Sequence, residues 1–379
     1  MAAIPFTGDN VQVNEEDFVD PEPVPVKPPS PKGRGSGENP PNRFAAYSFE
    51  PDAAEHDPLE PEPKTEFFLD QSRSIISHNQ SPDVPFDASI NVYRGCEHGC
   101  SYCYARPYHE YLGFSLGLDF ETKILIKEDA PELLRRALAS KTWKPQVLGI
   151  SGVTDPYQPV ERRLGITRRC LQVLAEFRNP VAVITKNRLI VRDRDILADL
   201  ATHQAASAML SIPTLDPELA AKMEPRASTP AQRLKAIQEL RSAGIPAGVM
   251  IAPVIPGMSE HEIPRILKAA AEAGAVQAGY TVLRLSPGVE EVFVSWLQEH
   301  FPGHEGKVLR KLEKLRDGKR HDSDFRYRML GRGIHAQQIH ALFQIGCTQT
   351  GLDKRPAPLS IRAFRRPQAG GPWLPGFEI

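Results

Sequence analysis

Three cysteines stand close together in the stretch RGCEHGCSYCYARP. Cys96, Cys100 and Cys103 are separated by three residues and then by two. Thiolates bind soft metals, so this spacing indicates a metal or redox site. Four-ligand zinc sites usually have two separated C-x-x-C pairs or added histidines, and His98 or His109 could complete such a site. A cubane iron-sulfur cluster is the other interpretation, in which three thiolates hold three irons and the fourth iron stays open to another ligand.

The composition predicts a cytoplasmic protein with no membrane span. The chain has 379 residues, of which 41% are hydrophobic, and no stretch approaches the roughly 20 apolar residues that cross a bilayer. The start, MAAIPFTGDN, has no basic segment followed by an apolar run, so no secretory signal is expected. An odd total of five cysteines fits free thiols in a reducing compartment.

Charge is distributed unevenly along the chain. Residues 1–65 carry 13 acidic and 5 basic side chains, whereas residues 300–379 carry 15 Lys or Arg and 7 Asp or Glu. A basic C-terminal region can bind nucleic acid or another polyanion. The other interpretation is that these charges form ordinary solvated faces.

Composition also predicts four segments. Residues 1–70 hold 13 prolines and are expected to form a disordered, acidic arm. Residues 71–299 are expected to be the catalytic domain. A basic helical extension is predicted for 300–365 and a flexible tail for 366–379.

Between residues 85 and 300, short β-branched runs alternate with helical periods. Such alternation implies parallel strands joined by right-handed crossovers, so we expect an α/β fold with a partial (β/α)6 TIM-like barrel. Strands are predicted at 89–95, 147–151, 181–185, 206–212, 247–253 and 277–285, and helices at 129–139, 166–177, 189–201, 229–243, 260–273 and 288–299.

In a parallel barrel, functional groups gather at the C-terminal ends of the strands. The cysteines follow the first predicted strand, and SGVTDPYQPVE follows the second. TKN, SIPTLD and APVIPG follow the next three. Polar residues therefore recur at one predicted edge, although hydroxyls, Pro and Gly also follow strands in ordinary turns.

The wider sequence resembles a known family. The cysteine spacing with Tyr102 before the last cysteine, the stretch SRSIISHNQSPDVPFDASINVYRGCEHGCSYCYARP, and TDPYQPVE are similar to radical S-adenosylmethionine (SAM) enzymes of the spore photoproduct lyase-like branch. The resemblance covers residues 70–290 densely. It implies a [4Fe-4S] cluster, bound S-adenosyl-L-methionine, a 5'-deoxyadenosyl radical that abstracts hydrogen from a substrate, and an electron donor such as flavodoxin or ferredoxin.

The resemblance also implies roles for individual residues. Many relatives hold the SAM ammonium with a Gly-Gly-Glu turn after the second strand, and this chain has a hydroxyl-plus-carboxylate stretch there instead. The implied cluster ligands are Cys96, Cys100 and Cys103; the implied SAM contacts are Tyr102 at the adenine, Ser151, Thr154 and Asp155 after the second strand, Lys186 at the carboxylate and Ser211 at the ribose.

One departure concerns the hydrogen-atom donor. Spore photoproduct lyase uses a cysteine after the second strand, and this chain has none between Cys103 and Cys170. Tyr104 or Cys347 could donate instead, although packing for Tyr104 and a buried structural role for Cys347 are the simpler interpretations. Cys170 itself is expected to be a small buried hydrophobe.

Other ionisable residues give weaker signals. His335 and His340 are five residues apart, so they do not share a helix face and no second metal site is expected. Glu161 and Glu224 are plausible residues of the barrel mouth, although charged groups beside loops are usually solvated.

The substrate prediction rests on the basic C-terminal region and on kinship. Nucleic acid is the leading candidate, followed by a peptide or a small metabolite. The alternative function is a zinc-stabilised nucleic-acid-binding module without catalysis.

Overall fold

A seven-stranded sheet forms the centre of the molecule in the computed structural model, which describes residues 30–45, 63–354 and 356–367. Its order is β10-β9-β8-β7-β6-β3-β2. The strands from β3 to β10 pair in parallel and β2 pairs antiparallel with β3. Within the described ranges the two edge strands do not pair, so the sheet is open. The strands are β2 (Ile76–His78), β3 (Ala88–Ile90), β6 (Leu148–Ile150), β7 (Val181–Thr185), β8 (Ala206–Ser211), β9 (Ala247–Val254) and β10 (Ala278–Val282).

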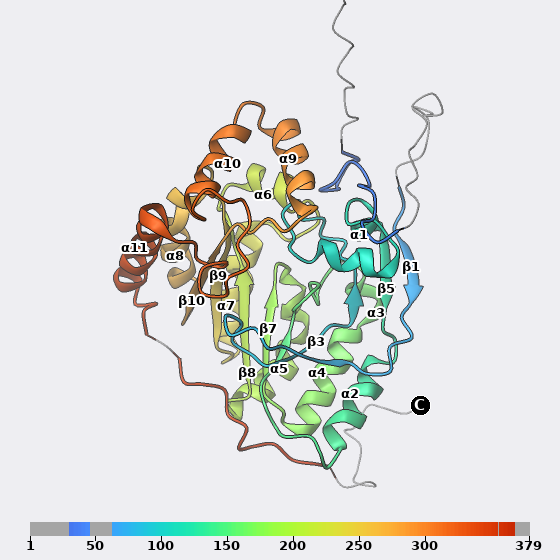
Figure 1. Cartoon of the computed structure of the whole chain (residues 1–379). Coiled ribbons are helices and arrows are strands. Elements are labelled where there is room, and N and C mark those ends of the chain that lie inside the picture. The colour runs from blue at the N-terminus through green and yellow to red at the C-terminus, as the bar shows by residue number, and fades with distance from the viewer. Residues whose placement is uncertain (1–29, 46–62, 355, 368–379) are drawn as a thin grey trace, which may run out of the picture.

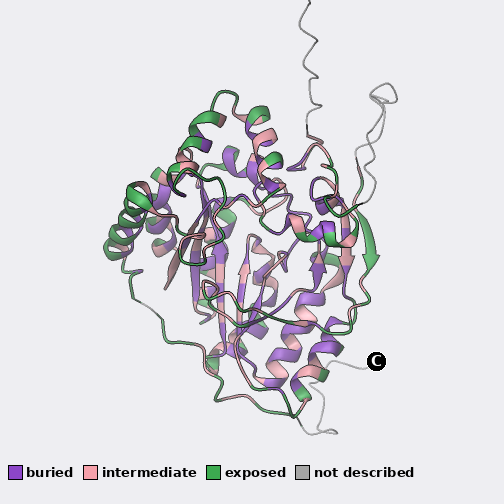
Figure 2. Cartoon of the chain, viewed as in Figure 1, coloured by how far each residue is buried: buried purple, intermediate pink, exposed green. Residues whose placement is uncertain are grey.

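Helices between the strands cover the sheet, as (β/α) crossovers require. The helix α5 packs against β8, α7 against β8 and β9, and α8 against β9. The inner strands β3, β6, β7, β8 and β9 are mostly purple in Figure 2 because most of their residues are buried, as expected for parallel strands covered by helices. The crossover helices are α2 (Ala130–Ala139), α4 (Ile166–Phe177), α5 (Arg194–Thr202), α7 (Pro230–Ser242) and α8 (Ile263–Glu272), and shorter pieces are α1 (Asp119–Thr122), α3 (Glu161–Leu164), α6 (Pro217–Met223) and the 3-10 helices η2 (Arg106–Leu112), η3 (Arg188–Asp193) and η4 (Glu260–Glu262).

The predicted α/β fold with a partial six-stranded (β/α) barrel is confirmed. The last five predicted strands match β6 to β10 within three residues at each end. The helix predicted at 189–201 begins instead as η3 and becomes α-helical at Arg194.

The first predicted strand, 89–95, is divided between two sheets. Its start belongs to β3, whereas β4 (Tyr93–Arg94) pairs with β5 (Lys123–Ile126) in a three-stranded sheet of order β1-β5-β4, where β1 is Glu66–Leu69. The chain passes from one sheet to the other at Asn91, whose side-chain oxygen accepts a hydrogen bond from the backbone N–H of Val153. The chain therefore leaves the main sheet earlier than the sequence pattern predicts.

The predicted N-terminal arm is only partly described. Residues 1–29 and 46–62 lie outside the described residues, as do 368–379 of the predicted tail. Residues 30–45 and 63–70 are described, and they contact the segment that follows the cysteines. The proline-rich composition does not indicate these contacts.

The C-terminal part is helical, as predicted, with α9 (Val289–His300), α10 (Glu305–Lys314) and α11 (Gly333–Thr350). In Figure 1 the arrowheads of β7 and β8 point toward the end where α6, α9 and α10 lie. Apolar residues of these three helices form a second core cluster that includes Cys100 and Tyr102. The helix α11 packs on α8, where Gly346 meets Leu267. No helix in the described ranges is both long and apolar enough to cross a membrane.

Candidate active site

The cysteine loop connects β4 to η2 at the C-terminal edge of the sheet. All three thiols are free; Cys96 and Cys100 are buried and Cys103 is partly buried. Cys103 packs against the apolar cluster that contains Cys100 and also against the one that contains Cys96. Backbone bonds from Cys103 N–H to the Cys100 carbonyl (3.2 Å) and from Cys96 N–H to the Phe120 carbonyl (2.8 Å) hold the loop. The structure therefore brings the three predicted cluster ligands into one site.

The surroundings keep these thiols protonated. Burial raises the pKa of Cys96, Cys100 and Cys103 above the ordinary range, and the negative charges of Asp155 and Glu224 add to the effect on Cys96 and Cys100 respectively. Thiolates are the form that binds metal. A metal or cluster that binds this loop must therefore displace protons.

Three thiols in one loop are the kind of donor set that iron-sulfur clusters use. In the part of the chain that the structure describes, no group of three or more His, Cys, Asp or Glu side chains is placed to hold one metal ion. A tetrahedral zinc site requires four donors within about 2.0–2.3 Å of one ion. In a cubane, each thiolate binds a different iron, so the sulfurs need not converge on one point. The three thiols thus fit the [4Fe-4S] interpretation.

The two histidines considered for zinc have other surroundings. His98 is buried, with Nδ1 3.5 Å from Asp155 Oδ2 and Nε2 3.3 Å from Asn187 Nδ2. His109 is buried against the rings of Phe114 and Phe120. Burial lowers the pKa of His109 to about 4, so its imidazole is neutral near neutral pH.

Asp155 ties the ends of β6 and β7 together. Its Oδ1 accepts hydrogen bonds from Thr185 Oγ1 (2.7 Å) and Tyr157 N–H (2.8 Å), and its Oδ2 accepts one from Lys186 N–H (2.7 Å). Burial opposes ionisation, but His98 and these donors lower the pKa of Asp155 below its usual value. The carboxylate oxygens are thus largely occupied by protein partners, although the sequence predicted a SAM contact.

A buried charge network lies beside Cys100 and centres on Glu224. The Glu224 carboxylate accepts hydrogen bonds from the Tyr102 hydroxyl and the Arg233 guanidinium, and Lys186 Nζ lies 3.0 Å from its Oε1. Burial by itself would raise the pKa of Glu224, yet Arg233 and Lys186 outweigh it and lower the pKa to about 2. Lys186 Nζ also donates to the Ala252 carbonyl (3.1 Å) and lies 5.5 Å from the Tyr102 ring centre.

Three further predicted contacts also lie at strand ends. Ser151 follows β6 with a φ of 124°, which side-chain-bearing residues rarely adopt and which often marks functional sites. Thr154 Oγ1 donates to the Tyr93 carbonyl (3.1 Å). Ser211 is buried at the end of β8, and its carbonyl accepts a hydrogen bond from Arg233 Nη1 (2.6 Å).

The two predicted hydrogen-atom donors differ in position. Tyr104 is 50% exposed, follows Cys103, and donates to the Gly152 carbonyl (2.6 Å). Cys347 is buried in the main core on α11, and burial raises its pKa to about 11. Only Tyr104 is part of the cysteine loop.

For two acidic residues, the solvated interpretation is wrong. Glu161 and Glu224 are buried rather than solvated. Glu161 accepts hydrogen bonds from Tyr93 (2.5 Å) and Arg192 (2.7 Å), so partners from distant positions make burial possible. No local sequence signal identifies such partners.

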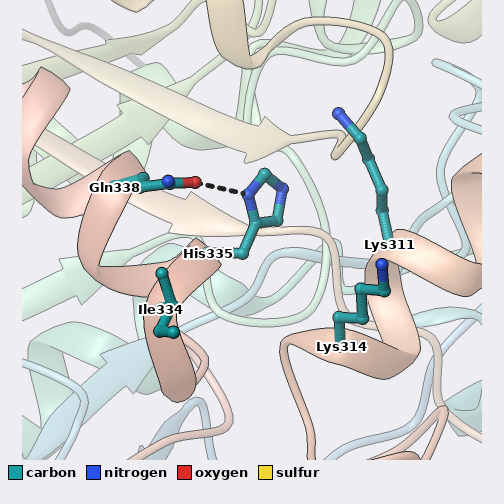
Figure 3. Close-up of a pocket in the computed structure, with 5 residues that line it drawn as sticks. All are labelled: Lys311, Lys314, Ile334, His335 and Gln338. Atoms are coloured by element: carbon teal, nitrogen blue, oxygen red, sulfur yellow. Dashed lines mark hydrogen bonds between the residues drawn. The ribbon is translucent and has the colours of Figure 1, made fainter.

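A separate cavity of about 410 Å³ lies between α10 and α11 (Figure 3). It is lined by Lys311, Lys314, Ile334, His335 and Gln338, and His335 Nδ1 lies 3.3 Å from Gln338 Oε1. None of these residues belongs to the cysteine loop or the strand ends described above. The cavity is therefore not the candidate active site.

The chain is similar to several known proteins. Residues 90–270 match the family model described as the Radical SAM superfamily. An uncharacterized protein of Mycobacterium tuberculosis is 35% identical over 221 residues, and this match spans 58% of the chain and 65% of the relative. An uncharacterized protein of Methanocaldococcus jannaschii is 28% identical over 199 residues, 52% of the chain and 71% of the relative.

Solved structures of spore photoproduct lyase have a similar fold. One, a mutant with bound AdoMet and dinucleoside spore photoproduct, has a TM-score of 0.51 at 15% identity and covers 75% of this chain and 78% of that chain. The C140S mutant has a TM-score of 0.51 at 14% identity with the same coverage. At this identity the likeness shows a shared fold.

We expect Glu224→Ala to lower the free energy of unfolding by about 3–5 kcal/mol, because it leaves the buried Arg233 and the largely buried Lys186 without their counter-charge. Urea denaturation of the cluster-free protein measures this. Glu239→Ala is the matched control, because its pair with the more exposed Arg188 should contribute less than about 1 kcal/mol. Equal losses in the two variants would contradict a structural role for the Glu224 network.

Proposed function

Because the chain belongs to the radical SAM superfamily, we propose that it binds a [4Fe-4S] cluster through Cys96, Cys100 and Cys103 and S-adenosylmethionine beside it. When bound, the cluster supplies the electron that splits SAM into methionine and a 5'-deoxyadenosyl radical, which abstracts a hydrogen atom from the substrate. The observation that carries this proposal is the set of three free thiols, gathered in one loop at the C-terminal edge of a parallel sheet. A donor such as flavodoxin or ferredoxin is proposed to provide the electron, in a cytoplasmic setting.

The residues around the loop are proposed to hold SAM. Lys186 presents a positive charge for the SAM carboxylate. The side-chain ammonium of Lys186 is oriented by Glu224 and the Ala252 carbonyl. The Tyr102 ring is proposed to pack near the adenine and Ser211 to bond the ribose. Apolar side chains of α6 and α9 surround Cys100 and Tyr102 and would keep water from a reactive radical.

The loop after β6 is proposed to receive the SAM ammonium. Ser151 supplies a hydroxyl from a strained backbone position, and Thr154 fixes the loop to β4 through the Tyr93 carbonyl. Asp155 is proposed to act mainly by orienting Lys186 and His98, because its oxygens already accept several protein hydrogen bonds. Tyr104 is the preferred hydrogen-atom donor, since it is exposed and follows Cys103 directly.

Nucleic acid is the proposed substrate class. A spore photoproduct lyase mutant of similar fold holds a bound dinucleoside spore photoproduct. In this chain, one face of α10 is basic. Lys307, Arg310 and Lys314 are exposed, spaced by three and four residues, and therefore lie on one side of the helix. In the described ranges they have no ion-pair partner, whereas several other bases of this region do, including Arg320, Arg328 and Arg332.

We expect Cys100→Ala to lose the cluster while the barrel stays folded, because the ligand loop lies outside the main core. Anaerobic reconstitution followed by iron and sulfide analysis, visible absorption and circular dichroism measures both properties. Cys170→Ala is the matched control, since Cys170 is buried in the core away from the loop. A wild-type protein that stays colourless and holds stoichiometric zinc would overturn the enzyme proposal in favour of the zinc-binding module.

We expect Asp155→Ala to weaken SAM binding by about tenfold or more while iron content stays unchanged, because the side chain orders Lys186 but is not a cluster ligand. Equilibrium binding of SAM to the reconstituted protein measures the affinity. Asp195→Ala, which removes a 59% exposed carboxylate paired with Arg168, is the control. An unchanged SAM affinity would remove Asp155 from the site.

We expect DNA binding to weaken steeply as salt rises, because phosphate neutralisation releases counterions. The double variant Lys307→Glu/Lys314→Glu should reduce the log–log salt slope by about 2, whereas Lys268→Glu, at an exposed position on α8, should leave it unchanged. Fluorescence anisotropy with a short duplex at several salt concentrations measures the slope. A flat salt response would favour a peptide or a small metabolite instead.

A further inference from the structure

Residues 33–39 form a strap that lies against the cysteine loop. In Figure 1 this dark blue segment runs beside α1. The backbone N–H of Gly35 donates to Glu121 Oε2 at 2.9 Å, and the carbonyl of Gly33 accepts a hydrogen bond from Arg226 Nε at 3.1 Å. The backbone N–H of Arg226 in turn donates to the carbonyl of His98, inside the loop, at 3.3 Å. The strap is thus joined to the loop through two different side chains.

The closest approach is between two glycine backbones. A Cβ atom added to Gly35 would lie 1.7 Å from the carbonyl oxygen of Gly99 and 3.2 Å from the backbone nitrogen of Ser101. Gly99 stands between Cys96 and Cys100 in the sequence. Any side chain at residue 35 would therefore have to displace the backbone that carries the ligands, because a carbonyl cannot move away as a flexible side chain can.

The same carboxylate holds the strap and the loop. Glu121 is fully buried; its Oε2 accepts the Gly35 N–H, and its Oε1 accepts a hydrogen bond from Arg106 Nη2 at 2.5 Å. Arg106 is also fully buried, and its Nε donates to the Cys100 carbonyl at 3.0 Å. A continuous chain of hydrogen bonds therefore runs from the strap to the peptide unit of a predicted cluster ligand.

The far end of the strap is fixed to the turn before α1. The Leu118 N–H donates to the Glu38 carbonyl at 3.0 Å. Asn39 and Asp119 exchange two hydrogen bonds, from Asn39 Nδ2 to Asp119 Oδ1 (3.0 Å) and from the Asp119 N–H to Asn39 Oδ1 (2.7 Å). Because α1 leads into β5, the partner of β4, this end ties the strap to the sheet that starts the cysteine loop.

We infer that the strap positions the cysteine loop for its cluster: it presses on the Gly99 carbonyl and fixes Glu121, so that the loop keeps its ligand-holding conformation before any metal binds. Gly35 is the key positioning residue, acting through Gly99 and the Glu121–Arg106 pair. The link to the cluster rests on the proposed function, whereas the effect of the strap on the loop does not.

The test compares thiol reactivity in the cluster-free full-length chain. In the Gly35→Ala variant we expect Cys96 and Cys100 to react with iodoacetamide about tenfold faster, because the loop opens more often, while the fully buried Cys170 reacts at the wild-type rate. Peptide mass spectrometry reads each cysteine separately. Gly306→Ala is the matched control, because its added methyl would meet only the flexible end of Arg310. After reconstitution, Gly35→Ala should also lose iron to a chelator faster than the control.

Wild-type alkylation rates at Cys96 and Cys100 in Gly35→Ala would overturn the inference, whether or not the chain binds iron. If the wild-type chain takes up no iron, the proposed function fails, and the alkylation rates still decide the role of the strap. If Gly35→Ala also exposes Cys170, the milder Asn39→Ala variant decides instead. It removes only the exposed strap contact with Asp119. Wild-type alkylation rates at Cys96 and Cys100 in this variant would equally overturn the inference.

Discussion

Two buried carboxylates, Glu121 and Glu224, and the largely buried Asp155 surround the cysteine loop. Each must be matched by partners because an ionised group removed from water is costly unless it is paired. Glu121 is matched by Arg106 and the strap, Glu224 by Arg233 and Lys186, and Asp155 by donors from the ends of β6 and β7. These partners come from separate elements of the chain. The loop therefore cannot shift far without leaving at least one buried charge unmatched.

The same charges act on the thiols. Arg106 and Lys186 lower the pKa of Cys103, although burial outweighs them, and Lys186 with Arg233 has the same effect on Cys100. The cations that match the carboxylates thus also favour the thiolate form that metal requires. A site whose donors are held by packing and by a surrounding layer of hydrogen bonds needs little rearrangement when a cofactor arrives. This arrangement explains why the charge network and the cysteines share one edge of the sheet.

The sequence predicted the parts of the fold that follow local periodicity. Parallel strands buried on both faces and amphipathic helices leave patterns within ten to fifteen residues, so β6 to β10 and most of their helices were found. The cysteine site was predicted because three cysteines lie close together in one loop. The burial of Glu224 was not predicted, because its partner Tyr102 is 122 residues away, and a carboxylate in a loop has no local sign of burial. The strap was missed for the same reason: its composition suggests disorder, and its order depends on Glu121, 86 residues from Gly35.

The helix α10 connects the chemistry of the loop to the proposed substrate surface. Its apolar residues Val308, Leu309 and Leu312 belong to the cluster that contains Cys100 and Tyr102, while its exposed face carries Lys307 and other basic residues. A helix with one face in this apolar cluster and the other in solvent holds its positive charge on the outer side of the cluster. Under the proposed function, a polyanion bound to the basic face would lie on the outer side of the apolar cluster that contains Cys100 and Tyr102.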